Sequence, residues 1–260
     1  MTREVAVKTS YANIYSKPSF SSEMVTQALF FEKLSVISEE GNWAKIAQWD
    51  GYKGFVHKFY ISEDYRFDGI DIVIKDRYLP LYNTPDLIDV AMYIPFASTV
   101  SSKKEKDEKF SICIESARFY YSQPTFANNK STRKDITDYC RNLIGSPYLW
   151  GGKTPFGYDC SGFVQSVFKA AGLEIERDTR DQIKNKSMAS IDINNARPGD
   201  LVFFNLDGNN VDHVGILNED NSVFHCSGQV KEQTLNHPTP ALLQDYILDV
   251  RSIEGMINEQ

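Results

Sequence analysis

Cysteine is scarce in this 260-residue sequence, and the four cysteines are not arranged as a disulfide framework. They include no Cys-x-x-Cys pair, and their density is far below that of a small scaffold held together by disulfides. This pattern excludes a disulfide-stapled fold and is typical of reduced thiols. We expect Cys113, Cys140 and Cys226 to be small structural side chains, which leaves Cys160 to be considered separately.

Long apolar runs are also missing. Nowhere do 18 apolar residues follow one another, so the sequence offers no candidate for a membrane-spanning helix. The first residues, MTREVAVKTSYANIYSKP, contain neither an apolar segment nor a small-residue cleavage site. We therefore expect a cytoplasmic protein with no membrane partner. A secreted or periplasmic location would require that a signal peptide had been removed.

Positive charge is in deficit. The chain has 28 Lys and Arg residues against 35 Asp and Glu residues, which gives a formal net charge of -7, and no long basic tract interrupts this balance. A nucleic-acid partner would need a concentrated basic surface, so we expect none. The same balance mildly favours cationic over anionic substrates.

Short strand-like runs fill the first half of the chain. Residues 3–62 alternate β-branched or apolar runs with turn residues, a spacing that favours a small β-barrel, and Asp50-Gly51 predicts a hairpin. With its NIYSKPS opening and DGYKGFV close, this segment resembles a bacterial SH3-like domain. Residues 65–125 are interpreted as a second, diverged barrel of this kind. We expect its charged run, residues 101–109, to form a hairpin tip, and residues 122–130 to form a linker.

From residue 131 the pattern becomes helical. Ser131 or Thr132 can cap a helix that has Asp135 in its first turn and ends at Gly145. Its apolar face consists of Ile136, Tyr139, Cys140, Leu143 and Ile144, so Cys140 is predicted to be a core residue.

A lone cysteine at the start of a second predicted helix is the candidate nucleophile. Cys160 follows Gly157-Tyr158-Asp159, and apolar residues recur after it at helical intervals. The unpaired N–H groups at the start of a helix favour thiolate over thiol, so we expect a lowered pKa for Cys160. The same N–H groups could form an oxyanion hole.

A cysteine nucleophile needs a base, and the base needs an orienting group. His213 in VDHVGIL and His225 in SVFHCSG lie on adjacent predicted strands. If residues 218–222 form the loop, Leu217 faces Val223, and both histidines project from one face of the hairpin as diagonal neighbours. We expect His213 to take the proton of Cys160, or to hold it as an ion pair, and His225 to orient His213. His57 and His237 are predicted to be surface residues.

These motifs resemble a known family when they are taken together. GSPYLWGGKTPFGYDCSGFV, RDTRDQ, ARPGDLVFF, DHVGIL and VFHCSG, in that order, are similar to the NlpC-type family of bacterial cell-wall cysteine peptidases, whose fold is papain-like. The resemblance implies a catalytic set of Cys160, His213 and His225, with Tyr148 beside the nucleophile as an aid to the oxyanion. Tyr158 is expected to pack locally.

Two SH3-like domains before the catalytic domain resemble, more narrowly, the γ-D-glutamyl-L-diamino acid endopeptidases. In that subgroup the first barrel helps to bind a free amine, which makes Glu23, Tyr52 and Asp159 candidates for this role. Asp159 could instead serve only as a helix cap. Ser161 and Thr179 fall where the family places hydroxyls near the D-Glu carboxylate, and Thr179 departs from the more frequent serine.

The predicted fold class is therefore α+β: SH3-like β-barrels at residues 1–63 and 64–125 precede a papain-like domain at residues 126–260. The resemblance implies a monomeric cysteine endopeptidase without metal or cofactor. It would hydrolyse the bond between γ-D-Glu and diaminopimelate or Lys in peptidoglycan stem peptides with a free N-terminal L-Ala, through an acyl-enzyme on Cys160.

Two other classes stay open at this point. One is an amidase or acyltransferase on the same papain-like core that acts on another amide or on a lipid. The other is a non-catalytic cell-wall-binding protein with a degenerate third domain, against which the intact Cys160, His213 and His225 speak. Glu23 and Asp159 converging on one pocket would favour the peptidase.

Overall fold

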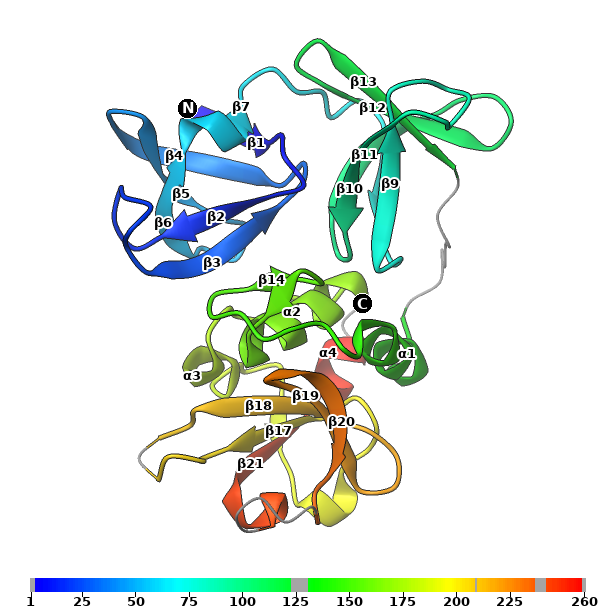
Figure 1. The fold of residues 1–260 in the computed structure, drawn as a ribbon. Coiled ribbons are helices and arrows are strands. Elements are labelled where there is room, and N and C mark those ends of the chain that lie inside the picture. Colours follow the sequence, from blue (N-terminus) through cyan, green and yellow to red (C-terminus); the bar gives the residue numbers. More distant parts are fainter. Residues whose placement is uncertain (1–2, 123–130, 209, 237–241, 259–260) are drawn as a thin grey trace. The chain divides into compact units, whose positions relative to one another are not determined.

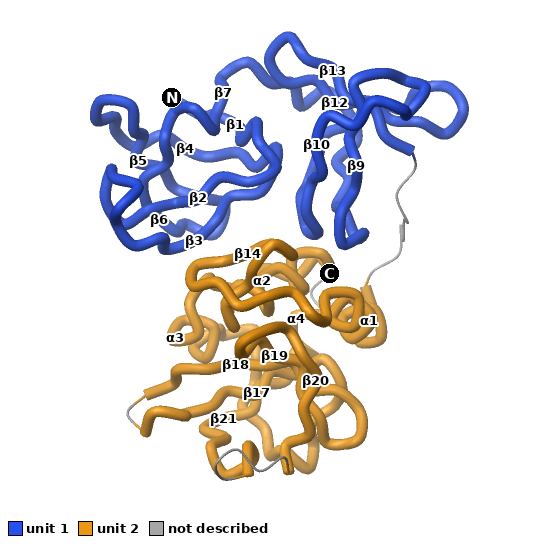
Figure 2. Tube along the Cα trace, viewed as in Figure 1, with its two compact units in different colours: residues 1–126 blue, residues 127–260 orange. Residues whose placement is uncertain are grey.

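The computed structural model describes residues 3–122, 131–208, 210–236 and 242–258. It divides the chain into two compact units, residues 1–126 and 127–260 (Figure 2). The predicted linker lies outside the described residues except for Ser122, and the predicted domain boundaries at 63/64 and 125/126 stay predictions.

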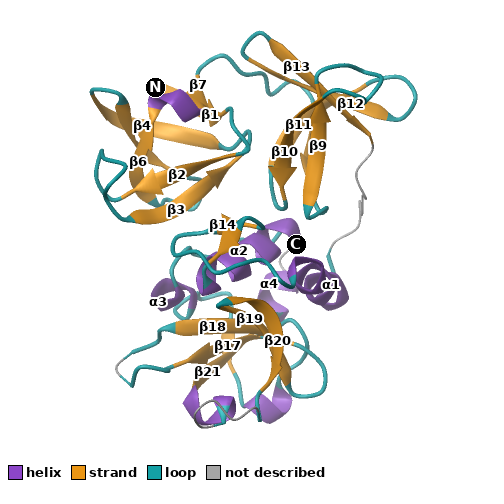
Figure 3. Ribbon diagram, in the orientation of Figure 1, coloured by secondary structure: helices purple, strands orange, loops and turns teal. Residues whose placement is uncertain are grey.

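The described residues of the first unit form two antiparallel sheets (Figure 3). The first has the strand order β3-β2-β6-β5-β4-β1-β7. Its elements are β1 (Arg3–Val7), β2 (Tyr11–Tyr15), β3 (Met24–Leu29), β4 (Lys33–Glu40), β5 (Trp43–Ala47), β6 (Lys53–His57), the 3-10 helix η1 (Lys58–Tyr60) and β7 (Ile61–Ser62). The predicted Asp-Gly hairpin is confirmed: Gly51, with a φ of 79°, lies in the turn between β5 and β6.

The second sheet has the order β10-β9-β13-β12-β11-β8. Its strands are β8 (Ile70–Val73), β9 (Tyr78–Tyr82), β10 (Val90–Pro95), β11 (Thr99–Lys104), β12 (Lys109–Ile114) and β13 (Ala117–Ser122). The predicted hairpin tip in the charged run is confirmed, although it is narrower than expected because residues 101–104 continue β11. Asp107 and Glu108 turn the chain with positive φ values of 55°.

The two sheets of the first unit share apolar packing. Phe30 and Phe31, in the turn between β3 and β4, are buried in the same cluster as the core of the second sheet, and Phe31 packs on Phe67 with ring centroids 4.7 Å apart. An ion pair of 2.9 Å between Lys8 and Glu115 also joins them. Burial of apolar surface stabilises by roughly 25 cal/mol per Å². The shared cluster therefore stabilises the packing of the two sheets of this unit on each other.

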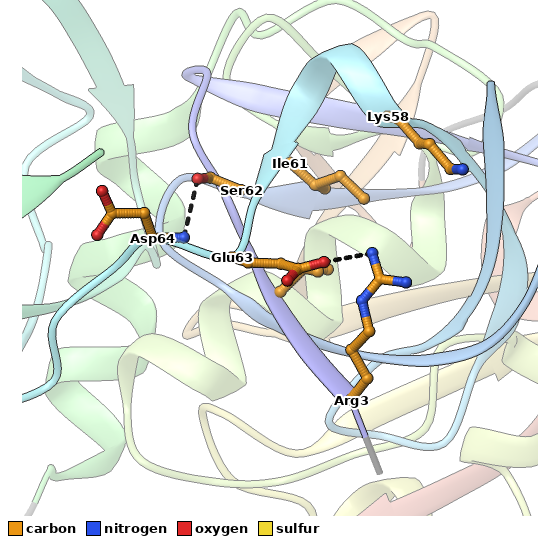
Figure 4. Close-up of a pocket in the computed structure, with 7 residues that line it drawn as sticks. Arg3, Lys58, Ile61, Ser62, Glu63 and Asp64 are labelled. Atoms are coloured by element: carbon orange, nitrogen blue, oxygen red, sulfur yellow. Dashed lines mark hydrogen bonds and ion pairs between the residues drawn. The ribbon is translucent and has the colours of Figure 1, made fainter. Parts of the chain in front are cut away.

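A cavity of about 390 Å³ opens beside β1, η1 and β7 (Figure 4). Arg3 in its wall is paired with Glu63 and with Glu39, and Glu39 also accepts a 2.8 Å bond from Lys58. The cations of this cavity are therefore already neutralised by carboxylates. Its lining contains no cysteine or histidine, so the chemistry predicted from the sequence lies elsewhere.

The second unit packs its α-helices on one side of a curved sheet of order β16-β21-β17-β18-β19-β20 (Figure 1). Its elements are α1 (Arg133–Leu143), β14 (Lys153–Thr154), β15 (Gly157–Tyr158), α2 (Cys160–Ala170), α3 (Thr179–Gln182), β16 (Ala189–Ser190), η2 (Ile193–Asn195), β17 (Leu201–Phe204), β18 (His213–Leu217), β19 (Ser222–Ser227), β20 (Gln229–Thr234), η3 (Leu243–Tyr246), β21 (Ile247–Ser252) and α4 (Glu254–Asn258). No helix in the described ranges is long and apolar enough to span a membrane.

The predicted helix after residue 131 is confirmed as α1. Thr132 caps it through a reciprocal pair of hydrogen bonds with Asp135, and Cys140 is buried as expected. Ile144, predicted to lie on its apolar face, is instead 41% exposed because α1 ends at Leu143. The predicted end at Gly145 thus overextends the helix by two residues, a common error at helix ends.

Helix α2 is the centre of the second unit rather than a surface helix. Every residue from Ser161 to Ala170 except Lys169 is buried, including the polar side chains of Gln165 and Ser166. Gln165 donates to the carbonyl of Ile175, and Ser166 donates to the carbonyl of Lys153. These bonds satisfy polar groups that would otherwise be costly to bury, and they fix the helix on both flanks.

Candidate active site

Cys160 is the first residue of α2, and Asp159 is its N-cap. The Asp159 carboxylate accepts a 2.6 Å hydrogen bond from the Gly162 amide. The Cys160 Sγ lies 3.8 Å from the Thr179 Oγ1 and 4.0 Å from the carbonyl oxygen of Asp212. The half-buried thiol therefore stands at the start of a buried helix, between α3 and the segment that leads into β18.

Three glycines allow the backbone around the nucleophile to pack without side chains. A β-carbon on Gly162 would lie 2.1 Å from the carbonyl oxygen of Gly152, and one on Gly152 would lie 2.2 Å from that of Gly157. A β-carbon on Gly157 would lie 2.5 Å from the β-carbon of Leu149. Since no β-carbon tolerates such distances, these three positions require glycine, and the chain packs closely on both sides of Cys160.

His213 and His225 meet across the β18–β19 hairpin. The register pairs Leu217 with Val223 and Gly215 with His225, which confirms the predicted alignment. The Nε2 of His213 lies 2.7 Å from the Nδ1 of His225. Both rings are buried, and α2 packs against the two strands that carry them. The structure thus brings the two histidines and the helix of Cys160 into one unit.

The absence of a side chain at Gly215 leaves room for this pair. A β-carbon there would lie 3.2 Å from the β-carbon of His225 and 3.0 Å from the carbonyl oxygen of Phe224, both tighter than ordinary contacts. We expect Gly215→Ala to displace His225 and to lower kcat about tenfold with little change in KM, because small displacements of catalytic groups are costly. Steady-state kinetics measure this effect. Ile216→Val, which trims the opposite face of β18, is the control, and an unchanged kcat in Gly215→Ala would contradict the argument.

Burial dominates the electrostatics of the histidine pair. It lowers the pKa of His213 to about 3, with further lowering from His225 and from Lys231. Burial and then Lys231, which is paired with His225 across β19 and β20, lower the pKa of His225 to about 4, against a raising hydrogen bond from Gln233. Both imidazoles are therefore neutral at physiological pH, the form in which His213 can accept a proton.

The same buried environment raises the pKa of the Cys160 thiol, whereas the sequence predicts a lowered pKa. Burial and then the nearby Asp159 carboxylate raise the pKa of the Cys160 thiol, against smaller lowering contributions from Thr179, from the Ser161 backbone and from Arg177. The expectation of a lowered pKa was wrong because desolvation outweighs the start of the helix. The resting site therefore favours a neutral thiol and a neutral imidazole.

The lowered histidine pKa values predict acid sensitivity. Because the unfolded histidines titrate at about pH 6.5 and the folded ones at about 3 and about 4, their burial costs no stability above pH 6.5, and the free energy of unfolding falls as the pH drops from 6.5 toward those lower values. At pH 5 each histidine should cost about 2 kcal/mol, that is, 1.5 pH units at about 1.4 kcal/mol each. We expect His225→Asn to lose less stability than the wild type between pH 7 and pH 5. Urea unfolding followed by hydrogen exchange in residues 131–258 measures it, and equal losses would contradict the assignment.

Tyr148 stands on the loop before β14 and is 40% exposed, and its backbone N–H donates to the carbonyl of Gly228 at 2.8 Å. Burial, followed by the Cys160 and Asp159 charges, raises the pKa of its phenol to about 12. The hydroxyl therefore keeps its proton and can donate a hydrogen bond to a developing oxyanion near Cys160.

Asp159 and Ser161 are engaged within the unit. Arg177, which is 3% exposed, binds the Asp159 carboxylate through both terminal nitrogens, at 3.0 and 2.6 Å, and donates to the Ser161 hydroxyl at 2.9 Å. Asp159 thus acts as a helix cap inside a buried ion pair, the alternative left open by the sequence. A direct contact of either residue with substrate stays a prediction.

Comparison with known proteins agrees with this geometry. A model of the NlpC/P60 family matches residues 145–251, and a model of the bacterial SH3 domain matches residues 10–62. A Bacillus subtilis (strain 168) protein named gamma-D-glutamyl-L-lysine dipeptidyl-peptidase is 30% identical over 204 residues, which are 74% of this chain and 68% of that protein. The chain belongs to the NlpC/P60 family.

Other members show the same relationship. A protein of Escherichia coli (strain K12) named Murein DD-endopeptidase MepS/Murein LD-carboxypeptidase is 32% identical over 155 residues, 58% of this chain and 80% of that protein. The crystal structure of an NlpC/P60 family protein from Bacillus cereus ATCC 10987 superposes with a TM-score of 0.82 at 19% identity, covering 96% of this chain and 99% of that chain. This likeness shows the fold alone, and it confirms the predicted fold class of SH3-like β domains before an α+β catalytic domain.

The remaining predicted site residues lie outside the NlpC/P60 unit. Glu23 is exposed directly before β3, and its carbonyl accepts from the Ser16 amide. Tyr52 is half-buried in the β5–β6 turn, where its amide donates to Asp50. Whether they reach the substrate stays a prediction. His57 is half-buried against Phe20 and Trp43 rather than fully exposed, and His237 lies outside the described residues.

Sequence reasoning missed three contributors to this NlpC/P60 site. Arg177 opens the RDTRDQ motif, and the sequence gives no sign that it binds Asp159 and Ser161. Gly215 carries no side chain to signal its function. Asp178 is a further half-buried carboxylate. It directly precedes Thr179, whose hydroxyl approaches Cys160. The aspartate directly before Thr179 in the RDTRDQ motif could have flagged Asp178. Among the described residues, no group of three or more His, Cys, Asp or Glu side chains is arranged to hold a metal ion.

Proposed function

We propose that this chain is a cysteine endopeptidase that hydrolyses the bond between γ-D-Glu and a diamino acid in peptidoglycan stem peptides with a free N-terminal L-Ala. The observation that carries the proposal is the placement of Cys160 at the start of α2, next to the hairpin that joins His213 to His225 at 2.7 Å. The name of the Bacillus subtilis relative supports the choice of bond.

The reaction begins with attack of the Cys160 Sγ on the γ-carbonyl carbon while His213 accepts the thiol proton. If His213 accepts at Nδ1, its Nε2 carries hydrogen and donates to the Nδ1 of His225, which fixes the tautomer. The tetrahedral oxyanion is stabilised by N–H groups at the start of α2 and by the Tyr148 hydroxyl. His213 then protonates the departing amine, and water hydrolyses the acyl-enzyme with His213 as base.

Recognition of the L-Ala ammonium requires carboxylates, because a cation removed from water must be paired. We propose Glu23, Tyr52 and Asp159 for this role as the sequence predicts, and we add Asp178 because it adjoins the Thr179 hydroxyl beside the nucleophile. Ser161 and Thr179 are proposed to lie near the D-Glu carboxylate. A single chain suffices for catalysis, since Cys160, His213 and His225 all belong to one unit.

Mass spectrometry of the reaction products tests this function. Incubation with L-Ala-γ-D-Glu-L-Lys, or with the diaminopimelate peptide, should release the dipeptide L-Ala-γ-D-Glu and the free diamino acid. Cleavage of the L-Ala–D-Glu bond, or no cleavage of either peptide, would contradict the proposal.

We further propose a cytoplasmic role in the recycling of cell-wall peptides. The support is chemical: a stem peptide gains a free N-terminal L-Ala only after an amidase has removed the sugar, so the substrate is a released fragment rather than the intact wall.

A further inference from the structure

A buried ion pair lies directly behind the proposed nucleophile. Both terminal nitrogens of Arg177 bind the Asp159 carboxylate, at 3.0 and 2.6 Å, and the two side chains are 1% and 10% exposed. Such two-point contacts fix orientation as well as distance. Both side chains are shielded from bulk water, so solvent and salt screen this ion pair little.

The Asp159 carboxylate joins three segments of the chain. One oxygen accepts from the Gly162 amide in α2 and from Arg177. The other accepts from the Gly151 amide, in the loop that carries Tyr148, at 2.9 Å and from the second Arg177 nitrogen. The carboxylate therefore binds the Tyr148 loop, the start of the Cys160 helix and the Arg177 segment together.

The Arg177 segment is held to α2 at a second point. Gln182, which is fully buried, donates to the carbonyl of Ser161 at 3.1 Å and to the carbonyl of Glu176 at 2.8 Å. Thr179 lies between Arg177 and Gln182, and its hydroxyl faces the Cys160 Sγ at 3.8 Å. The wall formed by Thr179 is thus anchored on both sides to the first turn of the nucleophile helix.

We propose that Arg177 is a positioning residue: its ion pair with Asp159 holds Tyr148, Cys160 and Thr179 in register and neutralises the carboxylate next to the thiol. This proposal rests on the proposed role of Cys160 as the nucleophile. It assigns to Arg177 a purpose that a simple structural ion pair would not have, namely control of thiol reactivity.

The charge argument follows from what faces the thiol. Cys160 is surrounded by Tyr148 on its loop, by Asp159 and Arg177, by Thr179, by Cys226 on β19 and by the β18 end that carries His213. The Thr179 hydroxyl favours a thiolate by its hydrogen bond; of the two charged neighbours, Asp159 disfavours a thiolate and Arg177 favours it. If Arg177 loses its charge, the Asp159 carboxylate is left uncompensated beside a thiol that must ionise.

The test measures alkylation of Cys160 by iodoacetamide as a function of pH, with mass spectrometry of the Cys160 peptide, on the full chain without substrate. We expect Arg177→Met to shift the thiol titration upward by about one unit, which slows alkylation about tenfold at pH 7. Arg177→Met combined with Asp159→Asn should return the titration to the wild-type range, because both charges are removed. Arg180→Met, an exposed arginine three residues away, is the matched control.

A role confined to packing predicts a different result. If Arg177 only stabilises the fold, the double variant will not restore the titration, and that outcome overturns the proposal, as does an Arg177→Met thiol with wild-type reactivity. Should Arg177→Met fail to fold, Arg177→Lys, which keeps the charge without the two-point contact, and the charge-free double variant still decide the question. Alkylation requires no substrate, so the two proposals can fail separately. If the Arg177 variants shift the Cys160 titration as expected but the protein cleaves no stem peptide, the proposed function is refuted and this inference stands.

Discussion

Cys160→Ala should abolish hydrolysis of L-Ala-γ-D-Glu-diaminopimelate while leaving substrate binding roughly intact. Removal of an enzyme nucleophile lowers kcat by as much as about 10⁶-fold when the mechanism is covalent, so we expect a loss of at least about 10⁴-fold. The reason is that no other cysteine can replace it: Cys140 and Cys226 are fully buried, and Cys113 lies in the first unit. Product release measured by mass spectrometry and peptide binding measured by calorimetry separate the two effects.

Cys113→Ala provides the matched control, since it removes a half-buried cysteine from β12 and should leave turnover unchanged. Detectable hydrolysis by folded Cys160→Ala would remove Cys160 from the mechanism. Trapping of an acyl-enzyme on the wild-type Cys160 peptide, and its absence in the variant, gives independent support for covalent catalysis.

N-acetylation of the L-Ala amine should have the second largest effect. It deletes the ammonium charge and with it the charge-assisted hydrogen bonds to the proposed partners, which should cost about 3–4 kcal/mol, or roughly 10²–10³-fold in kcat/KM. Steady-state rates on free and acetylated L-Ala-γ-D-Glu-L-Lys measure this difference. Equal rates would refute the proposed roles of Glu23 and Asp159.

Single carboxylate variants then locate the amine site. We compare Glu23→Gln, Asp159→Asn and Asp178→Asn. A variant that removes a direct partner of the amine should reduce the difference in kcat/KM between the free and the acetylated peptide. A variant that slows both peptides equally identifies a residue that acts on the nucleophile instead. The contacts of Asp159 with Arg177 and with two backbone amides make this second behaviour a clear alternative for Asp159.

Local patterns predicted much of this molecule because they depend on neighbouring residues. The Asp-Gly turn, the cap at Thr132 and the alignment of Leu217 with Val223 each follow from short-range rules, and the structure confirms them. The facing of His213 and His225 followed from that alignment, since the side-chain period of a strand is two.

Features that depend on tertiary burial could not be predicted in this way. The ion pair between Asp159 and Arg177 joins residues 18 positions apart whose partnership exists only after α3 folds against α2. The raised pKa of Cys160 reflects desolvation, which no motif records. Gly215 matters because of the side chain that faces it across the hairpin, whereas a glycine within a strand can equally mark a bulge or a bend.

The glycine contacts behind the nucleophile have a consequence for how this enzyme can evolve. Gly152, Gly157 and Gly162 have no room for a β-carbon, so a substitution at any of the three must displace the loop or the helix that carries Cys160. Side chains on the same loop, among them Leu149 and Trp150, are 40% and 61% exposed. Substrate preference can therefore change through substitutions at the exposed positions, whereas the glycines must be kept. A mutant library should vary the exposed loop positions and leave the three glycines unchanged.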